Sequence, residues 1–270
     1  MARKTSVSDN NSYPEFCYLA SRHDNIFDNF KRYPIYYSIV EHFSAWEIEI
    51  GAKYLNHIFN NYSFSDNQWA DFLKNDSLGN PNVAEYVLGD KYLTASPTTL
   101  RYVKVLSDIL SLFDTDNIKS ISEVGGGYGG QCHVVMQMFP RITYNLIDLP
   151  EVLALAEKYL NRLNHSKQDI RYFDGTHFYS DLHADLFISN YAFSELSKPV
   201  QDIYIDKIIL NSKAGYITWN YGGQRLNTWD NDGYHLDEFL AKIPNSISIP
   251  ENPPRTDFNS IILWGTKERK

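Results

Sequence analysis

Cysteine is scarce in this sequence, and positive charge is outweighed by negative charge. Only Cys17 and Cys132 are present among 270 residues, far apart and at no metal-ligand spacing. This excludes a disulfide-stapled scaffold and favours a reducing compartment. Lysine and arginine total 25 against 33 aspartate and glutamate, a net charge of −8. An acidic chain is a poor electrostatic partner for nucleic acid or an anionic membrane, so we expect neither as a partner.

Long apolar runs are also missing. The most apolar windows are far shorter than the about 20 residues that a membrane-spanning helix needs. Residues 1–16 have no apolar run behind their basic residues, so they are not typical of a signal peptide. We therefore expect a cytoplasmic protein. Hydrophobic residues still make up 43% of the chain and aromatic residues 15%, which is enough for a sizeable core and excludes a disordered chain.

The pattern of apolar residues changes near residue 117. Before it, apolar side chains recur every three or four positions, which predicts a segment that is helical throughout, with helices at 34–60, 65–74 and 96–113. After it, short apolar strands alternate with helices, which predicts a mostly parallel sheet with right-handed crossovers. The expected strands are 118–124, 143–149, 170–173, 185–189, 216–219, 247–249 and 261–264, and the expected helices are 131–139, 151–161 and 200–210.

The predicted fold is therefore α/β, with two regions. Residues 1–116 form a helical cap that would supply the acceptor pocket and could form a dimer interface. Residues 117–270 form a doubly wound, Rossmann-like domain that binds the cofactor. Ligands in such sheets bind outside the carboxyl ends of the strands.

A glycine-rich loop, Glu123–Gln131, is the strongest local signal. Five of its residues are glycines, and it directly follows an apolar strand. Glycine allows a sharp turn and close approach to a ligand, and the helix start that follows offers free N–H groups. The spacing fits both a dinucleotide loop and a methyltransferase loop. Asp148, at the end of the next strand, suits both because a carboxylate there accepts hydrogen bonds from ribose hydroxyls, although it could instead cap the helix before Pro150.

Two acidic positions favour S-adenosylmethionine over a dinucleotide. Glu123 can face the ammonium group of a bound amino acid, whereas it would repel a pyrophosphate. Asp174 and Gly175 follow the third strand, where a side chain can reach an adenine amino group. An NAD-dependent dehydrogenase and a non-catalytic cofactor-binding scaffold remain the alternatives.

Three segments together resemble a known family: Glu123–Gln131, Asp148–Leu153 and Ser189–Leu196. They resemble the bacterial sugar O-methyltransferases, class I S-adenosylmethionine-dependent enzymes associated with surface-polysaccharide biosynthesis. Similarity runs from roughly Ser96 to Asn220. The resemblance implies an O-methyltransferase that converts S-adenosylmethionine to S-adenosylhomocysteine while methylating a sugar or sugar-derived hydroxyl. The expected cofactor-binding residues are Arg101, Glu123, Gly125, Gly126, Gly127, Tyr128, Gln131, Asp148, Leu149, Asp174, Gly175 and Asn190.

The catalytic base is less evident. The chain is more distantly similar to plant small-molecule O-methyltransferases, whose catalytic histidine aligns with Phe193, and phenylalanine cannot take a proton. Glu195, just past the fourth strand, is the first candidate for a general base, and a helix-capping carboxylate is the alternative. His235, in the cluster Asp232–Glu238, is the second candidate. That cluster could also hold a divalent cation, but a surface loop explains it equally well, so we assign no metal.

Two arginines are candidates for binding an anion. Arg101 lies one turn into the helix that follows Ser96, where it could bind a carboxylate or phosphate of the cofactor or of the acceptor, or form a surface salt bridge. Arg225 follows the fifth strand and is a weaker candidate for an acceptor phosphate. We expect His42 and His57 to be ordinary helix residues.

Overall fold

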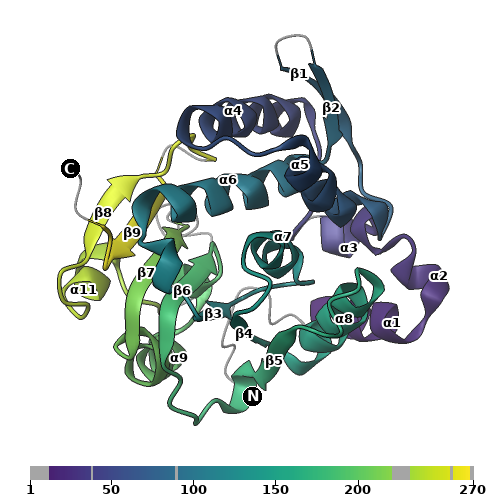
Figure 1. Ribbon diagram of the computed structural model, residues 1–270. Helices are drawn as coiled ribbons and strands as arrows, with labels where there is room; N and C mark the ends of the chain where they lie inside the picture. The colour runs from purple at the N-terminus through teal and green to yellow at the C-terminus, as the bar shows by residue number, and fades with distance from the viewer. Residues whose placement is uncertain (1–11, 38, 89–90, 221–231, 256–257, 268–270) are drawn as a thin grey trace.

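The computed structural model describes residues 12–37, 39–88, 91–220, 232–255 and 258–267 (Figure 1). Its centre is a seven-stranded sheet with the strand order β5-β4-β3-β6-β7-β9-β8. Strands β3 to β7 are parallel, and β9 runs antiparallel to both of its neighbours, β7 and β8. The bounds are β3 Ser120–Val124, β4 Thr143–Asp148, β5 Asp169–Asp174, β6 Ala184–Asn190, β7 Ser212–Trp219, β8 Ile247–Pro250 and β9 Ser260–Trp264. The predicted strands and the α/β fold are confirmed.

Apolar side chains alternate along the central strands and build a core on each face of the sheet. In β6, Leu186 and Ile188 belong to one cluster, whereas Phe187 belongs to the other. Successive side chains thus point to opposite faces of the sheet, and both faces are apolar, as expected of a strand that is buried on both sides. Helices cover both faces, and in Figure 1 α4 and α6 run above the sheet while α9 lies on its other side.

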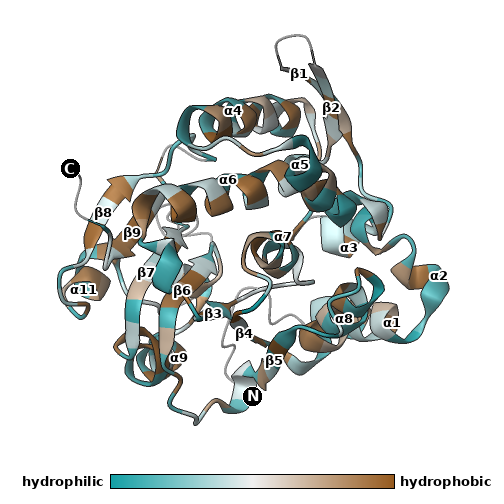
Figure 2. Ribbon diagram, viewed as in Figure 1, coloured by the Kyte–Doolittle hydropathy of each residue, from teal (hydrophilic) through white to brown (hydrophobic). Residues whose placement is uncertain are grey.

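The three predicted helices of the second region are α7 Gly130–Met138, α8 Pro150–Arg162 and α9 Lys198–Tyr204, which continues into one π-helical turn at Ile205–Ile209. A further short helix, α11 Leu236–Leu240, precedes β8. The helices before the sheet are α1 Ser12–Arg22, α2 Asp24–Phe27, α3 Pro34–Tyr37, α4 Ala45–Asn61, α5 Asp66–Leu73 and α6 Pro97–Leu112. Figure 2 shows apolar and polar residues side by side along α4 and α6, as expected of helices that bury one side. None of the described helices is long and apolar enough to cross a membrane.

Helix starts follow the predicted capping residues. Ser65 and Gln68 form a reciprocal capping box at the start of α5, and the hydroxyl of Ser96 accepts a hydrogen bond of 3.0 Å from the backbone N–H of Thr99 at the start of α6. α1 packs against α8, and α4 packs against α6. Cap and sheet therefore share one hydrophobic cluster.

Two expectations about the first region are wrong. The helix predicted over 34–60 is two helices, α3 and α4, because Ser44 adopts an extended conformation and its hydroxyl accepts a hydrogen bond from Glu47 N, which starts a new helix. The region is also not helical throughout. β1 Ala84–Leu88 and β2 Lys91–Ala95 form an antiparallel hairpin that projects from the body in Figure 1. Tyr86 is buried while Val87 is exposed, which is the alternation of a strand.

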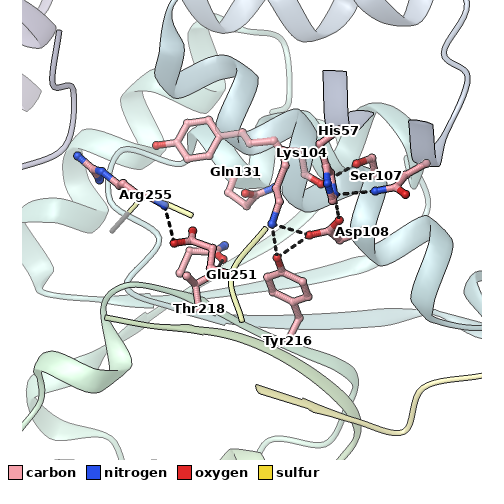
Figure 3. A network of polar contacts seen from close by, with 12 residues as sticks. His57, Lys104, Ser107, Asp108, Gln131, Tyr216, Thr218, Glu251 and Arg255 are labelled. Atoms are coloured by element: carbon pink, nitrogen blue, oxygen red, sulfur yellow. Dashed lines mark hydrogen bonds and ion pairs between the residues drawn. The ribbon is translucent and has the colours of Figure 1, made fainter. Parts of the chain in front are cut away.

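A buried polar network joins the cap to the sheet (Figure 3). The carboxylate of Asp108 on α6 lies 2.8 Å from Lys104 Nζ and 2.6 Å from His57 Nε2 of α4, and it accepts a hydrogen bond of 2.7 Å from the Tyr216 hydroxyl of β7. Burial alone would raise the pKa of Asp108, but Lys104 and His57 lower it below its usual range. His57, expected to be an ordinary helix residue, is thus a partner in this network.

Candidate functional site

A cavity of about 400 Å³ opens at the carboxyl ends of the parallel strands. This is the edge at which ligands bind in doubly wound sheets. Successive strand ends contribute its lining: Glu123–Gly127 at the end of β3, Ile147–Leu149 at the end of β4, Gly175 and Thr176 after β5, and Asn190–Ala192 with Glu195 from the end of β6 onward. Arg101 and Gln131, from α6 and α7, and Arg255, from the loop after β8, add further polar side chains to the wall.

The glycine-rich loop leaves room for a ligand at one of its glycines. Gly125 and Gly127 both have positive φ, 79° and 56°, a conformation that favours glycine. A Cβ at Gly125 would lie 2.1 Å from the Cβ of Ala192, so close packing also requires glycine there. A Cβ at Gly127 would have no atom within 4 Å, so the backbone at that position faces open space in the cavity wall.

Asp148 ties the end of β4 to this loop. Its carboxylate accepts hydrogen bonds from the backbone N–H of Gly127 at 2.9 Å and of Leu149 at 2.8 Å. Burial raises the pKa of Asp148 to about 6, and the two backbone donors limit the rise. α8 begins after Leu149, so Asp148 is not its N-cap residue. A carboxylate therefore lines the cavity where a ribose-binding group was expected.

Glu123 provides a second acid on the same side of the cavity. It is 2% exposed and accepts a hydrogen bond of 2.8 Å from the Tyr144 hydroxyl. Burial raises the pKa of Glu123 to about 8. A cationic ligand group placed against it would favour the ionised form, so this position is suited to an ammonium group.

Two side chains in the wall have buried polar atoms without partners among the described residues. Gln131 donates to the carbonyl of Tyr102, but its Oε1 has no partner. Asn190 accepts from the Thr218 hydroxyl, but its Nδ2 has no partner. Buried polar groups are normally hydrogen-bonded, so an unpaired acceptor and an unpaired donor in one cavity wall favour a polar ligand.

Glu195 lies in the turn that follows β6. Its Oε1 accepts a hydrogen bond of 3.1 Å from Asn220 Nδ2. Burial raises the pKa of Glu195 to about 7, and Asn220 and Arg255 oppose the rise. Phe193, two residues earlier, is fully buried and packs against Trp219 and Phe239. Glu195 is thus the carboxylate of this turn that faces the cavity, with a pKa near neutrality.

Arg101, Tyr191 and Arg255 form what we call the arginine cleft. The guanidinium carbon of Arg101 lies 5.3 Å from the centroid of the Tyr191 ring, and the guanidinium carbon of Arg255 lies 5.7 Å from the same centroid. Tyr191 adopts a φ of 64°, which is uncommon for a side chain of its size. Neither Tyr191 nor Arg255 was expected from the sequence. Tyr191 lies in a segment singled out for its resemblance, but no local motif marks Arg255.

Three expected site residues lie outside the cavity lining. The Tyr128 side chain is fully buried between the cap and α8, where its hydroxyl accepts a hydrogen bond from Asn75 and its ring packs on Tyr159. The carboxylate of Asp174 turns back to the backbone N–H of Thr176, so Gly175 and Thr176 line the cavity instead. His235 is exposed at the start of α11.

Two further candidates lie in the region after β7: Arg225 for an acceptor phosphate, and the cluster Asp232–Glu238 for a divalent cation. Arg225 lies outside the described residues. Within the described residues, no group of three or more His, Cys, Asp or Glu side chains could hold a metal ion.

The segment that contributes most of this lining has recognisable relatives. Residues 98–195 match the family model of the O-methyltransferase domain. The O-methyltransferase match begins in α6 and ends at Glu195, so it includes Arg101, the glycine-rich loop, Asp148 and Asn190. Arg255 and the helices before α6 lie outside it.

Individual relatives cover less of the chain. It is 34% identical over 67 residues to demethylspheroidene O-methyltransferase of Rhodobacter capsulatus, which is 25% of this chain and 17% of that protein. Among solved structures, PigF with SAH has a TM-score of 0.45 and 11% identity, over 59% of this chain and 60% of that one. The mitomycin 7-O-methyltransferase MmcR has a TM-score of 0.44 and 13% identity, over 82% of this chain and 68% of that one.

Proposed function

We propose that this protein is an S-adenosylmethionine-dependent O-methyltransferase that methylates a hydroxyl of a sugar or sugar-derived molecule, in the biosynthesis of surface glycans. The observation that carries the proposal is the glycine-rich loop with its open face at Gly127, flanked by Glu123 and Asp148, within the segment that matches the O-methyltransferase domain.

The residues on the β3–β5 side of the cavity fit S-adenosylmethionine. Glu123 would face the ammonium group, Asp148 would accept hydrogen bonds from the ribose hydroxyls, and Gly175 and Thr176 would lie along the adenine. The unpaired Gln131 Oε1 and Asn190 Nδ2 provide a buried acceptor and a buried donor for the polar atoms of such a ligand. When bound, this cofactor supplies a methyl group on a positively charged sulfur.

The residues on the β6 side fit the acceptor. Methyl transfer needs the acceptor oxygen aligned and free of its proton, which is chiefly a matter of positioning and of one general base. Glu195 lines the cavity and its pKa is raised to about 7, so it would take the hydroxyl proton near neutral pH. The fully buried Phe193 leaves no base at the position of the plant histidine.

Support for a sugar acceptor comes from the resemblance over Ser96–Asn220 to the bacterial sugar O-methyltransferases. Support for a cytoplasmic location comes from two buried cysteines that are both free. We expect the protein to act on a small molecule, either as a monomer or as a homodimer formed through the cap.

The experiment is methyl transfer with a panel of acceptors. Purified protein is incubated with S-adenosylmethionine and with free sugars, sugar acids, sugar phosphates, nucleotide sugars and phenols, and S-adenosylhomocysteine is quantified. We expect turnover with at least one sugar-type acceptor and its loss in Glu195→Gln. Turnover with phenols only would refute the sugar acceptor. Cofactor binding without turnover on any acceptor would favour a non-catalytic scaffold.

A further inference from the structure

The cavity has two chemically different sides along the strand order. The ends of β3, β4 and β5 carry the carboxylates Glu123 and Asp148. Across β6, Tyr191 and Arg255 come from the β6 end and from the loop after β8, and Arg101 reaches them from α6. An acidic side for the cofactor and a basic side next to Glu195 therefore share one cavity.

The aromatic ring of the arginine cleft is held firmly in place. The Tyr191 hydroxyl donates a hydrogen bond to Glu251, which is 4% exposed. The other carboxylate oxygen of Glu251 accepts from the backbone N–H of Arg255 and from Asn259 Nδ2, each at 3.0 Å. Figure 3 shows Glu251 bonded to the backbone of Arg255 while the arginine side chain extends away from it. Glu251 thus fixes the ring and the loop without pairing with the Arg255 guanidinium.

The two guanidinium groups of the cleft differ in their acidic partners. Arg255 pairs with Glu47 at 3.1 Å. Arg101 has no ion-pair partner among the described residues. Its guanidinium makes a hydrogen bond of 3.4 Å to the carbonyl of Val40 and lies against the rings of Tyr102 and Tyr191. A partly buried guanidinium without a counter-ion is costly, so a ligand anion would be strongly favoured there.

A neighbouring histidine responds to both arginines. Burial lowers the pKa of His42 to about 4, and the positive charges of Arg255 and Arg101 lower it further, as expected where two guanidinium groups lie close to one site. The protein as a whole has a net charge of −8, so a basic cleft in its main cavity is a local departure from its overall charge. Arginine pairs with oxyanions in a bidentate fork, which gives direction as well as attraction.

We propose that the methyl acceptor carries an oxyanion, a carboxylate or a phosphate, which binds to Arg101 and Arg255 beside the Tyr191 ring and so directs the reacting hydroxyl toward Glu195. This proposal rests on the proposed function, because it assigns the substrate class of the same site. It also assigns Arg101 to the acceptor rather than to the methionine end of the cofactor, because Arg101 shares the Tyr191 ring, at the end of β6, with Arg255 of the loop after β8.

The test is acceptor binding to the protein loaded with S-adenosylhomocysteine. Calorimetry compares hexuronic acids with the corresponding hexoses, and hexose phosphates with the same hexoses. We expect at least one acidic sugar to bind tenfold or more tighter than its neutral partner, and which of the two acidic classes binds identifies the oxyanion. If no acidic member binds better than its neutral partner, the proposal is wrong.

Variants separate this proposal from the proposed function. Arg101→Gln should weaken binding of the acidic sugar at least tenfold and change the affinity for S-adenosylhomocysteine less than twofold. Arg255→Gln provides a second test, and Arg162→Gln, an exposed arginine that pairs with Asp24 far from the cavity, is the matched control. Equal loss of S-adenosylhomocysteine affinity in Arg101→Gln would assign this arginine to the cofactor and overturn the proposal. If the unmodified protein does not bind S-adenosylhomocysteine, the proposed function itself fails.

Discussion

The carboxylate of Asp148 accepts a hydrogen bond of 2.9 Å from the backbone N–H of Gly127, so the end of β4 holds the glycine-rich loop that follows β3. Both residues line the cavity, and at Gly127 the loop faces open space. The same carboxylate that shapes the loop is thus available to the ligand. We infer that loop conformation and ribose binding depend on this one side chain.

Replacing Asp148 should therefore reduce cofactor affinity. We expect Asp148→Ala to weaken S-adenosylhomocysteine binding at least tenfold, a loss of about 1.4 kcal/mol, because it removes a ribose acceptor and frees the loop. Asp174→Ala is the comparison variant. The Asp174 carboxylate bonds to Thr176 and lies outside the lining, so we expect a smaller loss of affinity than in Asp148→Ala. Calorimetry measures both. A larger loss in Asp174→Ala than in Asp148→Ala would reverse the two assignments.

Glu195 should govern the pH dependence of turnover. Because burial raises the pKa of Glu195 to about 7 and a base must be ionised, kcat/KM should rise with pH below about 7 and level off above it. Glu195→Gln should lower kcat about 100-fold or more, lose this rise and keep its affinity for S-adenosylhomocysteine. His235→Gln, at an exposed position, should stay within twofold of the unmodified enzyme. An unchanged pH profile in Glu195→Gln would exclude Glu195 as the base.

Glu123 should make the ligand-free protein less stable as pH rises. Burial raises the folded-state pKa of Glu123 to about 8, so the folded state holds a proton that the unfolded state loses near the usual glutamate pKa. Its contribution to stability is therefore present at low pH and is lost as pH rises toward 8. We expect Glu123→Gln to be more stable than the unmodified protein at pH 8.5, and the difference to shrink toward pH 5. Urea unfolding at both pH values measures it, and a difference independent of pH would contradict the prediction.

The stability of the buried polar network between the cap and the sheet should depend on the Asp108 carboxylate. Asp108→Ala leaves Lys104, which is 2% exposed, without its counter-ion, so we expect a loss of about 3 kcal/mol or more in the free energy of unfolding. Adding Lys104→Met should recover part of this loss, because no unpaired charge then remains. Asp206→Ala, which removes an exposed partner of Lys207, is the control and should change stability far less, because exposed ion pairs contribute little. A loss equal to that of the control would mean that the buried pair adds nothing to stability.

Much of the fold could be predicted from local sequence patterns. Apolar runs correctly predicted the strands of the sheet, and serine caps correctly predicted the starts of α5 and α6. The hairpin β1–β2 was missed because its exposed Val87 and Tyr92 give no clear core face. The break before α4 was missed because Ile39 and Phe43 continue the helical spacing across it.

The residues of the candidate site could be predicted only where they belong to a sequence motif or adjoin one. The glycine-rich loop, Asp148 and Glu195 lie in or next to motifs, and the structure brings them to one cavity. The Tyr128 side chain lies outside the lining because a residue inside such a loop can point its side chain into the core, where Tyr128 meets Asn75. Arg255 could not be predicted, because its place beside Tyr191 depends on the pairing of β8 with β9 and on the loop that Glu251 fixes.

Calorimetric titration of the purified protein with S-adenosylmethionine, S-adenosylhomocysteine and NAD tests the central claim most directly. We predict micromolar binding of the first two ligands and no binding of NAD. Binding of NAD without S-adenosylmethionine would make the loop a dinucleotide site and would contradict the proposed methyltransferase.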